Sequence, residues 1–259
     1  MKIIIVHLAL FAATAGLAAT VRAAADIPVF ELRTYTTEPG ALDVLLARFR
    51  DHTAKLLEKH GITNVAYWVP ADAKDGAGNK LVVLLAHKSR DAAAAAWKEF
   101  SADPEWQAVV KAGGASVKSV TNVETVFLAA ADYAPAFAPG AGNGAAPRVF
   151  ELRTYTTPEG GLNALDARFR GGETDLFVKS GMTRVTFTHP LDADKGAGHT
   201  LIYLLAHANR EAATASWKAF RENPEWVKMK ADSEKAAGGP LTSKTQSVFL
   251  TPTDFSPTK

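Results

Sequence analysis

The chain of 259 residues is long enough for two domains, and its 47% hydrophobic and 22% charged residues are typical of globular protein. Its 29 basic and 27 acidic residues nearly balance, which argues against a nucleic acid as partner. The absence of cysteine excludes disulfides, thiol chemistry and a lipid-modified cysteine after a signal sequence.

The first 25 residues have the pattern of a secretory signal. A positive start at Lys2 precedes an apolar run over residues 3–11, and small residues follow as far as Ala25. The run is short for a membrane-spanning helix. We therefore expect residues 1–25 to be removed and the protein to be periplasmic or secreted, with no stable membrane span. Cleavage also removes Lys2 and Arg22, which leaves 29 − 2 = 27 bases against 27 acids.

Two copies of one module follow, 149 − 29 = 120 residues apart. The string VFELRTYTT occurs at 29–37 and again at 149–157. The same offset relates ARFR at 47–50 and 167–170, LLAH at 84–87 and 204–207, and PEW at 104–106 and 224–226. This period is far longer than that of solenoid repeats, so each copy is expected to be a whole domain. The boundaries are set at 26–134 and 149–259, with a Pro/Gly/Ala-rich linker at 135–148.

Each copy begins with a strand and a helix. Residues 30–35 alternate apolar and polar side chains, which predicts a half-buried strand, and Pro39-Gly40 predicts a turn. A helix follows, ended by Gly61. Its apolar face carries residues at helical spacing: Leu42, Leu45, Leu46, Phe49, Leu56 and Leu57.

The second part of each copy contains two strands, a helical region and a last strand. Residues 65–69 and the apolar run 81–86 are predicted strands. Ser89 or Asp91 can cap the next helix, and Asp103 followed by proline begins another. The final strands are placed at 123–128 and 246–250. The order β-α-β-β-α-β predicts two tandem ferredoxin-like domains of the α+β class.

The ordered set of motifs resembles the NIPSNAP family over nearly all of the chain after the signal. In the first copy the matching residues are 31–35 (ELRTY), Gly40, Arg48, Phe49, Gly61, Trp97, Phe100 and 103–106, and the second copy repeats them. The resemblance implies a dimeric α/β barrel, here formed within one chain, in which two sheets pack face to face around a central cavity. That fold is shared with small cofactor-independent monooxygenases and haem-degrading proteins. NIPSNAP proteins have no common established reaction, and the animal members are linked to mitochondria and protein interactions.

The first strand of each copy carries the candidate ligand-binding residues. Side chains two apart share a face of a strand. Phe30, Leu32 and Thr34 are expected to pack on the helices, and the polar triplet is expected to face the central cavity. That triplet is Glu31, Arg33 and Tyr35 in the first copy and Glu151, Arg153 and Tyr155 in the second. Arginine suits a carboxylate or oxyanion and tyrosine can donate a hydrogen bond. Alternatively, Glu31 and Arg33 only pair to satisfy buried charge.

His87 and His207 are the histidines present in both copies, each at the end of the apolar third strand. Each is either a base or an orienting group in the cavity, or a surface residue that ends a strand. The tryptophans at 97, 106, 217 and 226 are interpreted as packing residues. Asp192, Asp194 and Gly196 only faintly resemble a calcium loop. We expect no metal and no cofactor.

Three functions are compatible with these patterns. The first is a polar cavity that binds a small organic ligand, an anion among the candidates. The second is a non-catalytic binding or assembly module, which includes a homo-oligomer. The third is a cofactor-independent, monooxygenase-like enzyme by analogy of fold. The copies differ at 51–54 (DHTA) and 171–174 (GGET), which suggests that one half holds the ligand and the other supports it.

Overall fold

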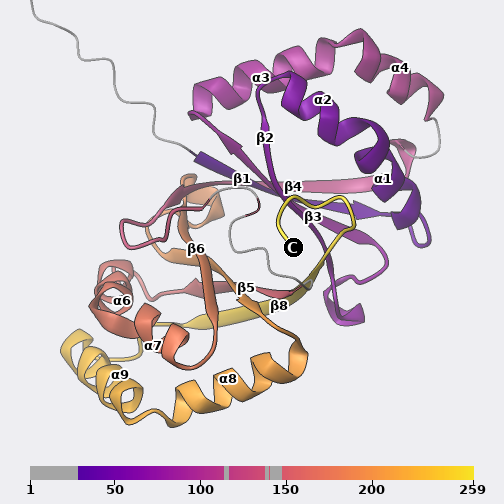
Figure 1. Ribbon diagram of the computed structural model, residues 1–259. Coiled ribbons are helices and arrows are strands. Elements are labelled where there is room, and N and C mark those ends of the chain that lie inside the picture. The colour runs from indigo at the N-terminus through magenta and orange to yellow at the C-terminus, as the bar shows by residue number, and fades with distance from the viewer. Residues whose placement is uncertain (1–28, 114–116, 138–139, 141–147) are drawn as a thin grey trace, which may run out of the picture.

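The computed structural model describes residues 29–113, 117–137, 140 and 148–259 (Figure 1). The expected signal peptide at 1–25 and most of the expected linker at 135–148 lie outside these residues. The first half consists of β1 (Val29–Thr37), α1 (Leu42–Arg48), η1 (Phe49–Thr53), α2 (Ala54–Lys59), β2 (Thr63–Pro70), η2 (Ala73–Asp75), β3 (Lys80–His87), α3 (Arg90–Ala102), α4 (Pro104–Ala112) and β4 (Val120–Ala130). The second half consists of β5 (Val149–Thr156), α6 (Leu162–Arg168), η3 (Phe169–Glu173), α7 (Thr174–Lys179), β6 (Thr183–Pro190), η4 (Ala193–Lys195), β7 (Thr200–His207), α8 (Arg210–Glu222), α9 (Pro224–Ala237) and β8 (Lys244–Pro252).

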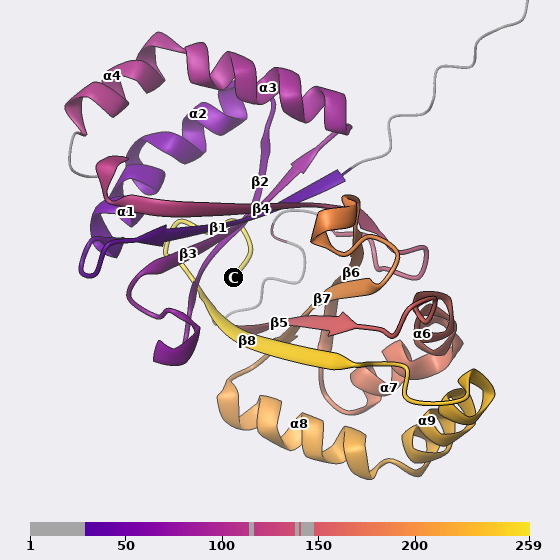
Figure 2. The same ribbon diagram turned by 180° about the vertical axis from the view of Figure 1, so that it is seen from behind.

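The strands close into a barrel in the order β1-β3-β2-β8-β5-β7-β6-β4. Each half contributes one antiparallel sheet, and short pairings of β2 with β8 and of β4 with β6 join the two sheets. The helices of each half cover the outer face of its own sheet (Figures 1 and 2). The predicted fold, two ferredoxin-like repeats that form a dimeric α/β barrel within one chain, is confirmed.

Local signals begin the helices where the sequence predicts. The Ser89 side chain accepts a hydrogen bond from the amide of Ala92 and so caps α3, and Asp103 accepts one from the amide of Glu105 and caps α4. Gly61, the predicted end of the first helix, has a φ of +74°, which glycine adopts without strain. Within the described residues, no helix is both long enough and apolar enough to cross a bilayer.

The space between the two sheets is filled by apolar side chains, so the predicted polar cavity there is wrong. The inward residues include Phe30, Leu32, Trp68, Leu84, Leu128, Leu152, Leu204 and Leu250. They leave a cavity of about 20 Å³, which has room for about one water molecule. Both faces of each sheet are buried, so alternation along β1 separates two faces without showing which one meets the other sheet. The apolar face does, because the lining of the inter-sheet cavity is mostly apolar and contains no charged residue that could pair with the triplet.

A hydroxyl placed in this interior is expected to destabilise the protein. Val82 lines the inter-sheet layer and is 4% exposed. Val82→Thr keeps the shape but buries a hydroxyl, and we expect the free energy of unfolding to fall by about 2 kcal/mol. Urea denaturation measures it. Val44→Thr, at a position that is 48% exposed, is the control, and equal small effects of both changes would argue for a wet interior.

Each half completes the core of the other with the segment that follows its last strand. After β4, the Ala131 amide donates to the Phe187 carbonyl at 2.9 Å, and Tyr133 packs on Phe187 with ring centroids 5.7 Å apart. After β8, Phe255 packs on Tyr67 in the same way, at 5.2 Å. The exchange makes the two halves structurally dependent on each other.

Candidate functional site

The polar triplet of the first half lies between the sheet and its helices, around one buried carboxylate. Glu31 is 1% exposed. Its Oε1 accepts a hydrogen bond from Arg33 at 2.7 Å, and its Oε2 accepts from Trp97 Nε1 at 2.7 Å. His87 Nε2 lies 2.8 Å from the same Oε2. Burial raises the pKa of Glu31, but the bond from His87 and the charge of Arg33 outweigh it and lower the pKa. Glu31 is therefore an ionised acceptor that ties β1 to β3 and α3.

The second half repeats this cluster with one more donor. Glu151 accepts from Arg153 at 2.5 Å, from Trp217 at 2.6 Å and from Ser247 at 2.6 Å, and His207 Nε2 lies 3.1 Å away. Burial opposes ionisation, but the bond from His207, the charge of Arg153 and the bond from Ser247 lower the pKa of Glu151 to about 2.

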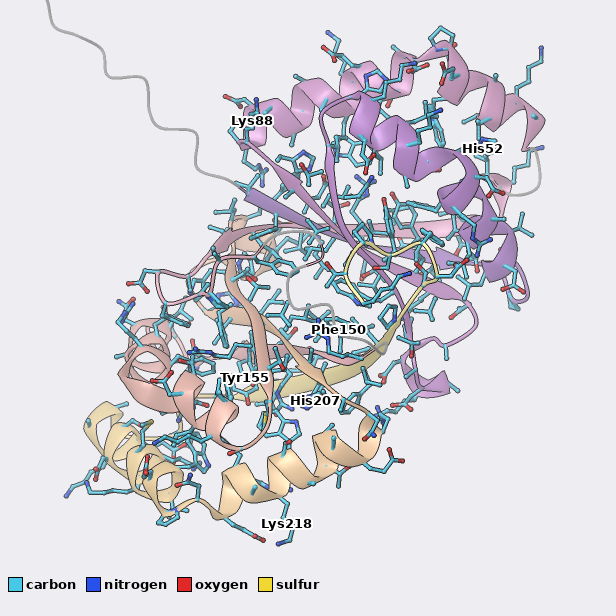
Figure 3. The ribbon with its side chains drawn as sticks, in the orientation of Figure 1. His52, Lys88, Phe150, Tyr155, His207 and Lys218 are labelled. Carbon is cyan, nitrogen blue, oxygen red and sulfur yellow. The ribbon has the colours of Figure 1, made fainter. Side chains whose placement is uncertain are left out.

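In the second half, the polar cluster lies on the face of the sheet that the helices cover. Figure 3 shows His207 on the side of α8, whereas Phe150, the residue before Glu151, lies between the two sheets. Phe150 is 0% exposed and its ring centroid is 5.4 Å from that of Trp68 in the other half. The two faces of β5 therefore have separate roles, one in joining the halves and one in holding the polar cluster.

Each strand arginine lies over a tryptophan ring. The Arg33 guanidinium carbon lies 4.3 Å from the centre of the Trp97 ring, and that of Arg153 lies 4.2 Å from the Trp217 ring. Arg153 also donates to the Tyr155 hydroxyl at 3.1 Å. Each guanidinium is thus held by a hydrogen bond to its glutamate and by contact with its tryptophan ring, so its position is set before any ligand arrives.

A cavity of about 240 Å³ lies next to Arg33, between β1 and the helices. Its lining comprises Arg33, Tyr35, Arg48, Phe49, Thr53, Trp97, Phe100, Ser101 and Trp106. Arg48 is the last residue of α1, and Phe49–Thr53 is the π-helical turn η1. Such turns shift the side-chain register of a helix and are frequent at functional sites. The cavity combines two arginines with aromatic side chains.

The equivalent cavity of the second half is wider, at about 470 Å³. Its lining comprises Glu151, Arg153, Tyr155, Thr214, Trp217, Phe220, Arg221, Trp226, Lys230 and Phe249. In the sheet beside it, Tyr203 is the strand partner of Arg153, whereas Val83 is the strand partner of Arg33. Tyr203 is 0% exposed and its ring packs on Phe187.

The sequence profile of the NIPSNAP family matches residues 30–135 and 150–257, which together cover most of the chain. This chain belongs to the NIPSNAP family. No curated protein matches it. The family profile matches each half separately, so this NIPSNAP protein contains two NIPSNAP domains in tandem.

Solved structures share the architecture of this NIPSNAP protein. A candidate monooxygenase from Lactobacillus acidophilus NCFM has a TM-score of 0.55 at 10% identity, over 87% of this chain and 94% of its own. A candidate monooxygenase from Fusobacterium nucleatum has a TM-score of 0.53 at 8% identity, over 87% and 92%. An anthrone oxidase-like protein has a TM-score of 0.51 at 15% identity, over 90% and 94%. At these identities the likeness shows the fold alone.

The geometry decides several predictions for the NIPSNAP strand residues. Glu31 and Arg33 do form an ion pair, at 2.7 Å, which both interpretations of the triplet allow. A surface position for the histidines is wrong, because His87 is 5% and His207 is 2% exposed. Neither histidine faces the inter-sheet space, since both bond the glutamates on the helix side. A ligand-binding role for these residues stays a prediction.

Other residues of the candidate site around Glu31 and Glu151 were not identified from the sequence. The interpretation of Trp97 and Trp217 as packing residues is incomplete, because both also donate to the glutamates. Their repetition in both copies was the available signal. Arg48 was identified only as a family motif residue, and Ser247, which donates to Glu151 and is paired with Arg153 as Thr125 is with Arg33, was not singled out.

Proposed function

We propose that this NIPSNAP protein binds a small organic anion between the sheet and the helices of a half, against the arginine of the ELRTY strand. The observation that supports it is the state of Arg33. Its guanidinium is anchored by Glu31 at 2.7 Å and by the Trp97 ring at 4.3 Å, yet it still lines a cavity. A preorganised guanidinium can donate to a carboxylate without losing much side-chain entropy.

The lining also indicates the shape of the anion. Trp97, Trp106 and Tyr35 place aromatic side chains in the lining, and a planar ring packs favourably against such side chains. A cavity of about 240 Å³ suits one ring with one carboxylate rather than a larger molecule. We therefore name a small aromatic carboxylate as the ligand class.

Benzoate titration tests the proposal, with the uncharged benzamide as the matched probe. We expect the wild-type protein to bind benzoate in calorimetry and benzamide at least about tenfold more weakly, because a charge-assisted hydrogen bond contributes about 1.5–3 kcal/mol. Arg33→Gln should weaken benzoate binding by at least about tenfold, and Arg33→Lys by less.

Arg50→Gln is the control, because Arg50 is exposed and pairs with Asp254 outside the cavity. Circular dichroism and urea unfolding verify that each variant is folded. Equal binding of benzoate and benzamide, or unchanged benzoate binding in folded Arg33→Gln, would contradict the proposal.

Cofactor-independent oxygenation is the second candidate function. The likeness of fold to two candidate monooxygenases and to an anthrone oxidase-like protein favours it, by analogy. In the reaction to be tested, anthrone and O₂ give anthraquinone and water. An oxygen electrode with anthrone as the probe measures it, and oxygen uptake no faster than in buffer would leave the binding function. The non-catalytic alternative includes self-association of the chain.

Export belongs to the proposal as well. It is supported by the positive start, apolar run and small residues of positions 1–25. In a periplasmic or extracellular setting, the protein would meet its ligand outside the cytoplasm.

A further inference from the structure

In the second half, each tryptophan of the cavity is followed one helical turn later by a basic residue. Residues four apart share a face of a helix. Arg221 therefore lies on the face of α8 that carries Trp217. In the same way, Lys230 lies on the face of α9 that carries Trp226. All four side chains line the cavity of about 470 Å³ next to Arg153, so cations from the strand and from both helices meet there.

The first half has the equivalent tryptophans without these two cations. The residue four positions after Trp97 is Ser101, and its hydroxyl donates to the Trp97 carbonyl oxygen at 2.7 Å. Ser101 thus bonds within its own helix. The residue four positions after Trp106 is Val110. The helices beside Arg33 therefore carry no basic residue at the positions of Arg221 and Lys230.

Arg221 is available to a ligand. It is exposed, and among the residues that the structure describes it forms no ion pair. The neighbouring Glu222 is bonded by Lys218 at 2.6 Å, and Figure 3 shows Lys218 on the outer side of α8. Lys230 differs, because it donates to Glu234 on its own helix at 2.5 Å. Arg221 rather than Lys230 is therefore the second cation that a ligand can pair with.

Arg153 provides the first cation, at the inner end of the cavity. Its Nη1 donates to Glu151 and its Nη2 to the Tyr155 hydroxyl, so each of these nitrogens keeps one further hydrogen for a ligand. The Arg153 side chain is 16% exposed, whereas Arg221 lies at the surface. The cavity thus has one guanidinium deep inside and one at its mouth.

This arrangement fits a planar ring with an anionic group at each end. Arginine forms its strongest hydrogen bonds with carboxylates, and a ring packs favourably on the aromatic side chains of the lining. The volume of about 470 Å³, against about 240 Å³ next to Arg33, gives room for a second carboxylate. The ligand class for this cavity is therefore longer than the one for the first half.

We infer that the second half binds an aromatic dicarboxylate, with one carboxylate on Arg153 and the other on Arg221. This inference rests on the proposed function, from which it takes the anchored strand arginine as the inner partner. It adds a second site on the same chain, its ligand class and the residue that sets it. The two halves then differ in the ligand that each one selects.

Two probes of the same shape test the inference on the full chain at pH 8. Terephthalate has a carboxylate at each end of its ring, and 4-carbamoylbenzoate has an uncharged amide in place of one of them. Calorimetry is done in Arg33→Gln, because this change weakens the site of the first half. We expect one terephthalate per chain, bound at least about fivefold more tightly than 4-carbamoylbenzoate. Arg221→Ser, which introduces the residue of the first half, should reduce this preference to about twofold or less.

Arg170→Ser is the matched control, because Arg170 is exposed and pairs with Asp132 outside the cavity. It should keep the preference, and circular dichroism and urea unfolding verify that each variant is folded. Equal binding of the two probes in Arg33→Gln would overturn the inference and leave the proposed function intact. So would a preference that persists in folded Arg221→Ser, or one that Arg170→Ser removes equally.

Benzoate binding to the wild type separates this inference from the proposed function. If benzoate fails to bind and terephthalate binds as expected, the site of the first half is contradicted and that of the second half stands. If neither probe binds, both proposals are overturned.

Discussion

Glu151→Gln is expected to lower the free energy of unfolding at pH 7 by about 3–5 kcal/mol. The carboxylate of Glu151 accepts hydrogen bonds from Arg153, Trp217 and Ser247, and His207 lies 3.1 Å from it. Glutamine replaces one acceptor oxygen of the carboxylate with an amide NH₂ group, which is a donor and cannot accept these bonds. It also leaves the Arg153 guanidinium, whose side chain is 16% exposed, without its counter-charge.

The loss should depend on pH in a defined direction. Glu151 has its pKa lowered from 4.5 to about 2 in the folded state, so its ionisation stabilises the fold above pH 4.5. That stabilisation disappears as the pH falls from about 4.5 through 2. The difference between the wild type and Glu151→Gln should therefore shrink by about 3 kcal/mol over this interval.

Urea denaturation at pH 7 and at pH 3 measures both effects, and the difference should have shrunk by about 2 kcal/mol at pH 3. Glu124→Gln, at an exposed position of β4, is the control and should change stability by less than about 0.5 kcal/mol. Glu31→Gln should act in the same direction but less strongly, because no serine donates to Glu31 as Ser247 does to Glu151 among the described residues. A loss below about 1 kcal/mol in Glu151→Gln, or one independent of pH, would show that the cluster is not a buried charge network.

The architecture was predictable because the signals for it are local or repeated. The offset of 120 residues reveals two copies, and alternation, helical spacing and the caps at Ser89 and Asp103 place the elements within each copy. The alternation of side chains along β1 was also predictable, since residues 30–35 do divide into an apolar and a polar face. These signals lie within a few residues of the structure they specify.

The side of the sheet on which the polar face lies was not predictable from β1 alone. That choice depends on Trp97, which is 66 residues from Glu31 and supplies a donor on the helix side. It depends equally on the apolar lining supplied by both halves between the sheets. A strand buried on both faces has no solvent side, so its own pattern cannot indicate which face is occupied by which neighbours.

The π-helical turns show a second limit of local signals. FRDHT at 49–53 and FRGGE at 169–173 form the same turn with little sequence in common beyond the first two residues. The glycines at 171 and 172 predict no more than a locally weakened helix, and Gly172 has a φ of +130°. That Glu173 would turn inward to Arg168 depends on burial by surrounding elements, which no spacing in the sequence reveals.

Glu173 should make the protein less stable as the pH rises towards neutrality. Burial raises the pKa of Glu173 from 4.5 to about 7, although Arg168 and Arg153 act in the opposite direction. The carboxyl ionises near pH 4.5 in the unfolded chain but only near pH 7 in the folded protein. The folded state therefore loses stability between these values, by about 3 kcal/mol in total, and keeps that deficit at higher pH.

Glu173→Gln should remove this dependence, because glutamine is neutral in both states. Urea unfolding at pH 5 and at pH 8 should show the variant gaining about 3 kcal/mol relative to the wild type as the pH rises. Tyr203 and Tyr133 also face Glu173, but both have pKa values raised far above this range and do not titrate in it. Glu159→Gln, in an exposed turn, is the control and should follow the wild type at both pH values. A variant that instead loses stability relative to the wild type as the pH rises would mean that the pair with Arg168 outweighs the cost of burying the carboxylate.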